Sequence, residues 1–342
     1  MDAKITKTRL GQMLSYDWIK IIAVALAAIL VWSLVFTMSA TRITATQQFV
    51  IMNYPGAWQG KSFNRYYDML GKDFSYEIIE MSAEDLATNE SQLGTLLETR
   101  FAVGTGDVMF APNVNDPDTK TEVKDEQGNV TDTTYTTYIS QFLNTSYFFY
   151  VAQLDDSADK DGYFTQMKNY LARFYAIASE TERTFGSVTL SVATFGDLDE
   201  SKVEAAFKAR IEKNKDKRFK TEEKIKQGVR DEVKRIQSYR AAYDAFFSYL
   251  EAGYIEFTVS TVTLGDTTRT GAYSINLCPN EDTMGKLKDY AYYSYTDENE
   301  KTLTSAKDMN LLFLELTELD HDFKYENVIF LNKVVSTVLE AA

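Results

Sequence analysis

Gln48-Phe49-Val50-Ile51-Met52 is the stretch that decides the fold, because it is a short apolar run followed directly by the turn-forming group Asn53-Tyr54-Pro55-Gly56. A run of this length that ends in a turn predicts a buried strand. Outward from it, we expect a helix over residues 58–70. A second strand is predicted over residues 74–81, which contain the β-branched pair Ile78-Ile79.

The next segment predicts another helix and a third strand. Ser82 stands three residues before Asp85, a spacing similar to a capping box, so we expect a helix from there to about Val103. Gly104-Thr105-Gly106 ends this helix, and residues 107–110 form a third apolar strand. The order strand, helix, strand, helix, strand with short connections predicts a parallel sheet covered by helices, and therefore an α/β fold.

An apolar segment precedes the first strand. It carries no charge from Ile21 to Thr41, and its first 18 residues are apolar except Ser33 and Thr37. About 20 such residues cross the hydrocarbon core of a bilayer as a helix. We therefore predict a single transmembrane anchor at residues 19–41, with the lipid bilayer as its partner. A cleaved signal peptide is the alternative.

Basic residues flank this segment unevenly. Only Arg42 follows it closely, whereas four basic residues precede it: Lys4, Lys7, Arg9 and Lys20. Positively charged flanks stay on the cytoplasmic side of a membrane. Residues 1–18 are therefore predicted to be cytoplasmic, and residues 43–342 are predicted to form an extracytoplasmic domain of a single-pass cell-membrane protein.

The opening of this domain resembles that of the extracellular solute-binding proteins of ABC importers. In that family the third strand commonly follows a glycine-containing run, similar to Val103-Gly104-Thr105-Gly106-Asp107-Val108. The resemblance covers about residues 47–111, a fifth of the chain. It implies a periplasmic-binding-protein-like fold, a small saccharide as ligand and an ABC permease as partner. The chain departs from the family because no lipobox cysteine follows the anchor, and because a domain of about 300 residues is short for the sugar-binding branch.

The rest of the domain predicts more strands and helices around two insertions. Residues 115–137 predict an inserted β-hairpin with a Gly-Asn turn. Helices are expected at residues 138–154, 163–180, 311–319 and 328–339, and strands at residues 188–192, 255–261 and 272–277.

Residues 199–252 predict a second insertion, a helical hairpin that differs in charge from its surroundings. After residue 42 the chain has 31 basic and 48 acidic residues, a net charge of −17, yet residues 202–240 contain 14 basic and 7 acidic residues. Apolar residues at helical spacing on both sides of residues 214–220 indicate the two helices. Four basic side chains at the connection are predicted to contact anionic lipid or wall polymer: Lys215, Lys217, Arg218 and Lys220. The alternative is an ordinary solvated helix end.

The loops around the first and third strands supply candidate ligand-binding residues. Ligands of parallel α/β sheets bind beyond the carboxyl ends of the strands. Trp58 and Tyr54 are predicted to stack on a sugar there, although Trp58 could instead pack on its own helix. Asp107 and Asn113 flank the third strand and could hydrogen-bond sugar hydroxyls, although Asp107 could equally cap a backbone loop. We expect Tyr54, Trp58 and Asp107 to share one crevice.

Composition argues against several other classes of function. A net charge of −14, from 36 basic and 50 acidic residues, is a poor match to a nucleic-acid-binding protein. Cys278 is the only cysteine and His321 the only histidine, which argues against an internal disulfide, a thiolate cluster or a multi-histidine metal site. No catalytic motif is visible. We therefore predict a non-enzymatic protein without metal or cofactor.

Two functions remain in competition, with an enzyme as a third class that no motif supports. The first is a membrane-anchored solute-binding-like protein that captures a saccharide for an ABC importer or assists one. The alternative is a non-catalytic scaffold or interaction protein of the cell envelope on a degenerate binding-protein fold. The second lobe discriminates between them, because a transport-type binder needs two α/β lobes that meet at a hinge.

Overall fold

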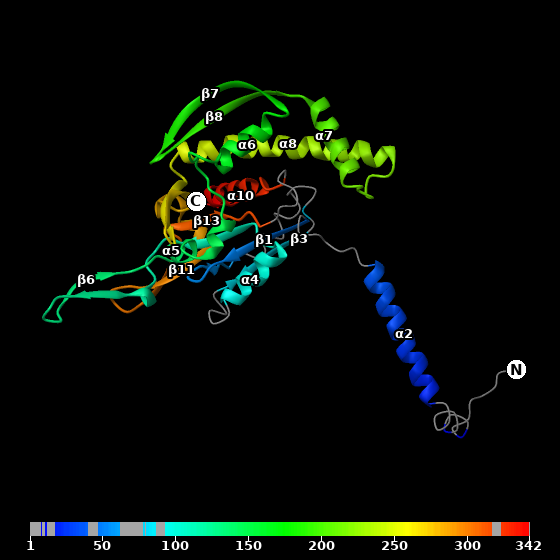
Figure 1. Cartoon of the computed structure of the whole chain (residues 1–342), viewed down its shortest axis with the longest axis horizontal. Coiled ribbons are helices and arrows are strands. Elements are labelled where there is room, and N and C mark those ends of the chain that lie inside the picture. Colours follow the sequence, from blue (N-terminus) through cyan, green and yellow to red (C-terminus); the bar gives the residue numbers. More distant parts are fainter. Residues whose placement is uncertain are drawn as a thin grey trace. The chain divides into compact units, whose positions relative to one another are not determined.

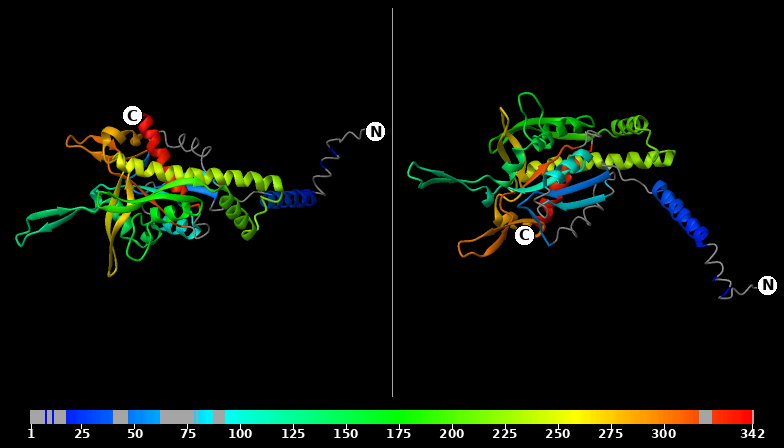
Figure 2. Two further views of the ribbon diagram at one scale, coloured as in Figure 1. Left: turned by 90° about the horizontal axis from the view of Figure 1, so that it is seen from above. Right: turned by 60° about the horizontal axis from the view of Figure 1, so that its bottom comes forward.

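The chain forms two compact units, residues 1–44 and 45–342, in the computed structural model (Figure 1, Figure 2). The structure describes residues 8, 11, 18–39, 47–61, 78, 80–86, 93–316 and 323–341. In the first unit, α2 (Trp18–Ser39) is, among the described residues, the one helix long and apolar enough to cross a membrane.

A six-stranded mixed sheet forms the centre of the second unit. Its strands are, in spatial order, β3 (Glu80–Asp85), β1 (Gln48–Asn53), β4 (Val108–Pro112), β13 (Met309–Phe313), β10 (Thr267–Asn276) and β9 (Glu256–Leu264). β1 pairs in parallel with both β3 and β4, whereas the pairs from β4 onward are antiparallel. The prediction of an α/β fold that begins with a parallel sheet is therefore confirmed.

Helices cover both faces of this sheet. Successive side chains of a strand point to opposite faces, so β1 contacts both helical layers. On one face Phe49 packs on Phe330 of α10 (Glu326–Ala341), with ring centroids 5.3 Å apart. On the other face Tyr54 packs on Phe142 of α5 (Tyr138–Leu143), also at 5.3 Å, beside α4 (Leu93–Val103) and the 3-10 helix η4 (Ser146–Tyr150). The result is a sheet between two helical layers, as Figure 1 shows.

The predicted helical hairpin is present and lies over α10. Its helices are α7 (Glu200–Lys213) and α8 (Glu222–Glu251), which begin after the capping side chains of Asp199 and Thr221. Asn332 of α10 donates a 2.7 Å hydrogen bond to the carbonyl of Ala242 in α8. Two further elements pack against α8, namely α6 (Tyr163–Leu171) and the ribbon of β7 (Tyr175–Phe185) and β8 (Val188–Leu198).

The smaller elements form hairpins and short helices at the periphery. β5 (Thr121–Lys124) and β6 (Val130–Thr134) make the predicted hairpin, whose turn contains Gly128 at φ 84°. β11 (Ala291–Thr296) pairs with β12 (Thr302–Ser305) and with β2 (Trp58–Gln59). The short helices are η3 (Pro117–Thr119), α9 (Glu281–Met284) and η5 (Gly285–Asp289).

Of the two helices predicted near the first strand, the one at residues 58–70 is wrong where the structure describes it. The one from Ser82 to about Val103 is wrong at its start but confirmed at residues 93–103, which form α4. Trp58 lies in a strand rather than at a helix start, because it pairs with Tyr292 of β11; residues 62–70 lie outside the described residues. Ser82 and Asp85 belong to β3 and pair with Val50 and Asn53 of β1. The hydrogen bonds and packing that β3 makes with the buried β1 stabilise the strand more than a local capping pattern stabilises a helix.

Two later helix predictions fail for the same physical reason. The helix expected over residues 163–180 ends at Leu171, and residues 175–185 form β7, which is held by pairing with β8. A helix is also expected over residues 311–319, but residues 311–313 are the last residues of β13, which lies between β4 and β10. All five residues of β13 are buried, and an apolar run buried on both faces does not alternate, so periodicity alone does not separate it from a helix.

Two helical glycines predict opposite responses to the same substitution. A Cβ on Gly228 of α8 would lie 2.3 Å from Cζ of Phe207 and 2.6 Å from Cε1 of Phe219, whereas a Cβ on Gly94 of α4 meets nothing within 4 Å. We expect Gly228→Ala to lower the free energy of unfolding by about 1–3 kcal/mol through overpacking. Gly94→Ala should raise it by roughly 0.5 kcal/mol, because alanine favours a helix. Chemical denaturation of the two variants checks this; stabilisation by both would contradict the packing of α7 on α8.

Candidate functional site

The carboxyl edge of β1 places two of the predicted ligand residues in packed surroundings. Tyr54 is 6% exposed and its ring packs on Phe142. Burial, with a smaller contribution from the charge of Asp116, raises the pKa of Tyr54 to about 12. Trp58 is half-buried in β2. The ring of Tyr54 is therefore a core contact and not a free stacking surface.

Asp107 lies at the opposite edge of the sheet from this pair, so the predicted shared crevice is wrong. It precedes β4, whereas Asn113 follows the strand, and the five residues of the strand separate the two by about 20 Å. Oδ2 of Asp107 accepts a 2.8 Å hydrogen bond from the N–H of Val50. Its carbonyl accepts bonds from the N–H of Leu314 (2.8 Å) and Nδ2 of Asn327 (3.1 Å). Asp107 thus holds backbone together, which was the alternative reading.

A buried charge network, which sequence reasoning missed, joins the helical hairpin to α10. Arg235 binds Glu232 at 2.5 Å, and Arg210 of α7 binds the same carboxylate at 3.0 Å. Arg235 also donates to the hydroxyls of Tyr170 (2.9 Å) and Tyr239 (3.0 Å).

Tyr239 links this network to α10. The hydroxyl of Tyr239 donates in turn to Glu326, the first residue of α10. Burial raises the pKa of Tyr239 well above its usual value, so its hydroxyl keeps the proton that it donates.

The sequence did carry a signal for this network. Glu232 lies four residues before Ile236, and Arg235 lies four residues before Tyr239, so both charges stand on the buried stripe of α8. Phe323 covers the charges from outside, with its ring 4.3 Å from Cζ of Arg235. Charged residues at apolar stripe positions predict buried ion pairs.

The connection between α7 and α8 presents the predicted basic side chains on an ordered turn. Lys215, Lys217 and Lys220 are exposed. Arg218 forms a 2.6 Å ion pair with Asp216, which lowers the pKa of that carboxyl. Phe219 packs edge-on against Phe207 of α7 at 5.0 Å and fixes the turn. We call Lys215, Lys217, Arg218 and Lys220 the basic tip.

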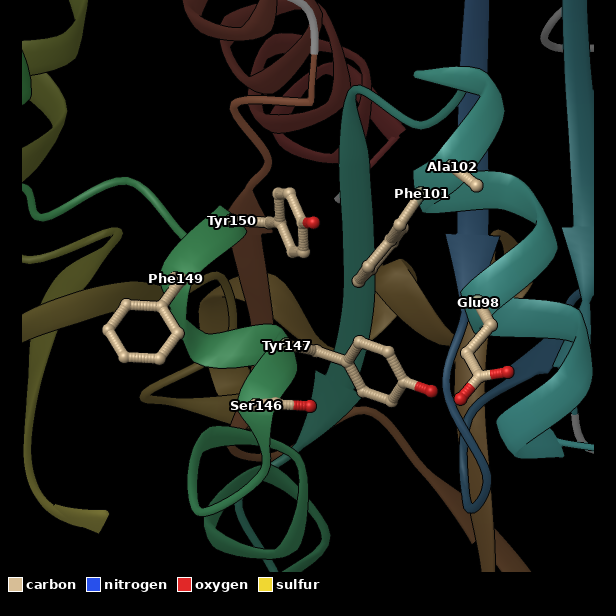
Figure 3. A pocket seen from close by; sticks show the side chains of 7 residues that line it. All are labelled: Glu98, Phe101, Ala102, Ser146, Tyr147, Phe149 and Tyr150. Atoms are coloured by element: carbon tan, nitrogen blue, oxygen red, sulfur yellow. The ribbon is translucent and has the colours of Figure 1, made fainter. Parts of the chain in front are cut away.

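An aromatic groove of about 510 Å³ lies between α4 and η4 (Figure 3). It is lined by Glu98, Phe101, Ala102, Ser146, Tyr147, Phe149 and Tyr150. The Phe101 ring lies 5.2 Å from the Tyr147 ring and 5.0 Å from the Tyr150 ring. Two of its aromatic residues are exposed to solvent: Phe149 is 71% exposed and Tyr150 is 38% exposed. The run of four aromatic residues 147–150 is the only part of this groove that is visible in the sequence.

Cys278 is not a reactive group. It is fully buried, and burial raises the pKa of its thiol to about 12. Among the described residues no group of three or more His, Cys, Asp and Glu side chains is arranged to hold a metal ion. His321 lies outside the described residues.

No protein-family model, curated protein or solved structure matches this chain. The function must therefore be argued from the site geometry itself.

Asp107 predicts that stability falls between about pH 4 and pH 7. Burial raises its pKa to about 7, against the opposing effect of the Val50 hydrogen bond. The folded protein therefore holds this proton more tightly than the unfolded chain, so unfolding becomes easier as pH rises through this window and the cost stays constant above it. Asp107→Asn keeps an oxygen for Val50 and should raise the unfolding free energy at pH 8 by on the order of 2 kcal/mol, with little change near pH 4.

The measurement compares denaturant midpoints of the two proteins at both pH values. The exposed Asp266 gives a control, Asp266→Asn, which should have the same small effect at both. An Asp107→Asn effect that does not depend on pH would contradict the assignment.

The buried charge network predicts a large loss of stability when one partner is removed. Arg235→Met leaves Glu232 partly uncompensated in the core and should cost about 3–5 kcal/mol. Lys226→Met on the same helix breaks only an exposed pair with Glu222 and should cost about 0.5 kcal/mol or less. Chemical unfolding of both variants tests the difference. Similar losses in the free energy of unfolding would show that the buried pair contributes no more to stability than an exposed one.

Proposed function

We propose that the chain is a membrane-anchored, non-catalytic interaction protein of the cell envelope, held by α2 and acting through the basic tip on an anionic partner. The observation that carries this proposal is that the basic tip lies at the end of a hairpin that is fixed to the core. The helical hairpin is fixed to the core by the buried charge network, and its turn exposes three lysines from a unit whose net charge is strongly negative.

The charge distribution favours an anionic partner for the tip specifically. The remainder of the unit repels anions, whereas each lysine near an anionic surface contributes about 1 kcal/mol of attraction. This attraction acts over about one Debye length, roughly 8–10 Å at moderate salt, so the tip must touch its partner closely. Phosphate groups of lipid headgroups or of a wall polymer have the required chemistry.

Continuity of the core supports interaction over transport. The parallel order β3-β1-β4 agrees with the resemblance to solute-binding proteins of ABC importers over one half of a sheet. However, the segment between β8 and β9 is the hairpin α7–α8, whose Tyr239 and Phe246 belong to the same hydrophobic cluster as Phe49 of the sheet. Two lobes that close on a saccharide need separable cores and a hinge. A shared core favours a rigid scaffold.

The anchor remains part of this proposal. The described residues of α2 from Trp18 to Phe36 have a mean hydropathy of 2.6, and none of them is buried. A helix of this composition gains free energy in a hydrocarbon environment. The greater number of basic residues before the segment supports a cytoplasmic N-terminus and an extracytoplasmic second unit.

Charge reversal at the tip tests the proposal. The full-length protein in neutral nanodiscs is titrated onto immobilised vesicles rich in phosphatidylglycerol and, separately, onto immobilised polyphosphate. Lys215→Glu, Lys217→Glu and Lys220→Glu together should weaken binding at low salt by about tenfold or more, and the difference should shrink at high salt. The probe that binds more tightly identifies lipid or polymer as the partner.

A matched control separates the tip from general charge effects. Lys286, Lys288 and Lys301 are also exposed, so their combined reversal to glutamate changes the net charge equally. Binding should then fall much less than with the tip variant. Equal losses from both variants, or no loss from the tip variant, would overturn the proposed role.

A further inference from the structure

Three rings from two separate elements make the aromatic groove a box and not a flat platform. The Phe101 ring of α4 meets the Tyr147 ring at an interplanar angle of 85° and the Tyr150 ring at 58°. Figure 3 shows Phe101 pointing from α4 toward both tyrosines of η4, whereas Phe149 points away from them. Steeply inclined rings enclose a small rounded group on several sides.

The box is held in place before any ligand arrives. Phe101 is only 5% exposed, and the hydroxyl of Tyr147 donates a 3.1 Å hydrogen bond to the carbonyl of Gly94, which ties η4 to α4. The ring of Phe142 stacks behind Tyr147 at 6.4 Å and 13°. A preformed site avoids much of the entropy cost of ordering side chains on binding.

The charge at the groove has one sign. Glu98 is exposed and is the charged residue among the described lining residues. The nearest cation along α4, Arg100, pairs with Glu84 instead. Glu98 has no ion-pair partner among the residues that the structure describes. The groove therefore offers ring faces and an available carboxylate together.

We propose that this groove binds an organic ammonium group between Tyr147 and Tyr150, with Glu98 as its counter-charge. A cation within about 6 Å of a ring centroid is attracted by the negative face of the ring, and partial removal from water strengthens this attraction. The negative net charge of the unit raises the local concentration of cations. This site is independent of the basic tip, which selects the opposite charge.

Other small occupants fit the lining less well. A sugar stacks best on a flat ring surface, which the inclined rings do not provide. An anion would face Glu98 without a described basic lining residue to offset it. The ammonium group can belong to a free quaternary amine or to a lysine side chain, and the two sources differ in their methyl groups.

Ligand-observed NMR on the full-length protein in maltoside micelles tests the site. The probes are choline, its uncharged carbon isostere dimethylbutanol, an acetylated lysine amide and a methyl glycoside, at constant ionic strength. Choline should bind at least about tenfold more tightly than its isostere, because only the charge differs. Tighter binding of choline than of the lysine amide would point to a quaternary amine, and the reverse to a lysine side chain.

Variants assign the binding to this groove. Tyr150→Leu and Glu98→Gln should each weaken choline binding by about five- to tenfold, whereas Tyr150→Phe keeps the ring and should retain most of the affinity. The exposed Tyr295 and Glu126 lie on other elements, so Tyr295→Leu and Glu126→Gln are the matched controls. Equal binding of choline and its isostere, tighter binding of the glycoside, or equal losses in the controls would overturn the proposal.

Discussion

The desolvation of four charges at one end of the core constrains the rest of the second unit. Arg210, Glu232, Arg235 and Glu326 come from three helices; Glu232, Arg235 and Glu326 are almost fully removed from water, and the Arg210 side chain is 14% exposed. Such charges are tolerated only while they remain paired and hydrogen-bonded, because an unpaired buried ion costs several kcal/mol. The helical hairpin therefore cannot move away from α10 without exposing or separating them. This fixes α8 over the layer that covers the sheet.

The same constraint extends into the sheet. Glu326 begins α10, and the next residue, Asn327, bonds the carbonyl of Asp107 immediately before β4. Asp107 in turn bonds the N–H of Val50 in β1. A continuous chain of polar contacts thus runs from the hairpin to the amino ends of the two central parallel strands. These contacts tie the hairpin to the sheet, an arrangement that is poorly suited to a closing motion between lobes.

Local patterns in the sequence were enough to predict some elements and not others. β1 and the two helices of the hairpin follow from an apolar run ended by a turn and from helical spacing. β3 and β13 depend on partners that are distant in the chain, so a capping motif and an apolar run suggested helices there. Asp107 was misplaced by geometry, because a residue before a parallel strand lies at the amino edge. Phe101 is 46 residues from Tyr147, so the groove required the fold to be known.

The two proposed surfaces differ in how strongly salt should affect them, and this follows from their construction. The lysines of the tip are exposed, so mobile ions screen their field within about 8–10 Å at moderate salt. The rings of the groove are partly withdrawn from water, and attraction of a cation to a ring face acts at contact, where no screening ion fits. Under the two proposals, one acidic unit presents an anion-selective and a cation-selective surface without either one neutralising the other.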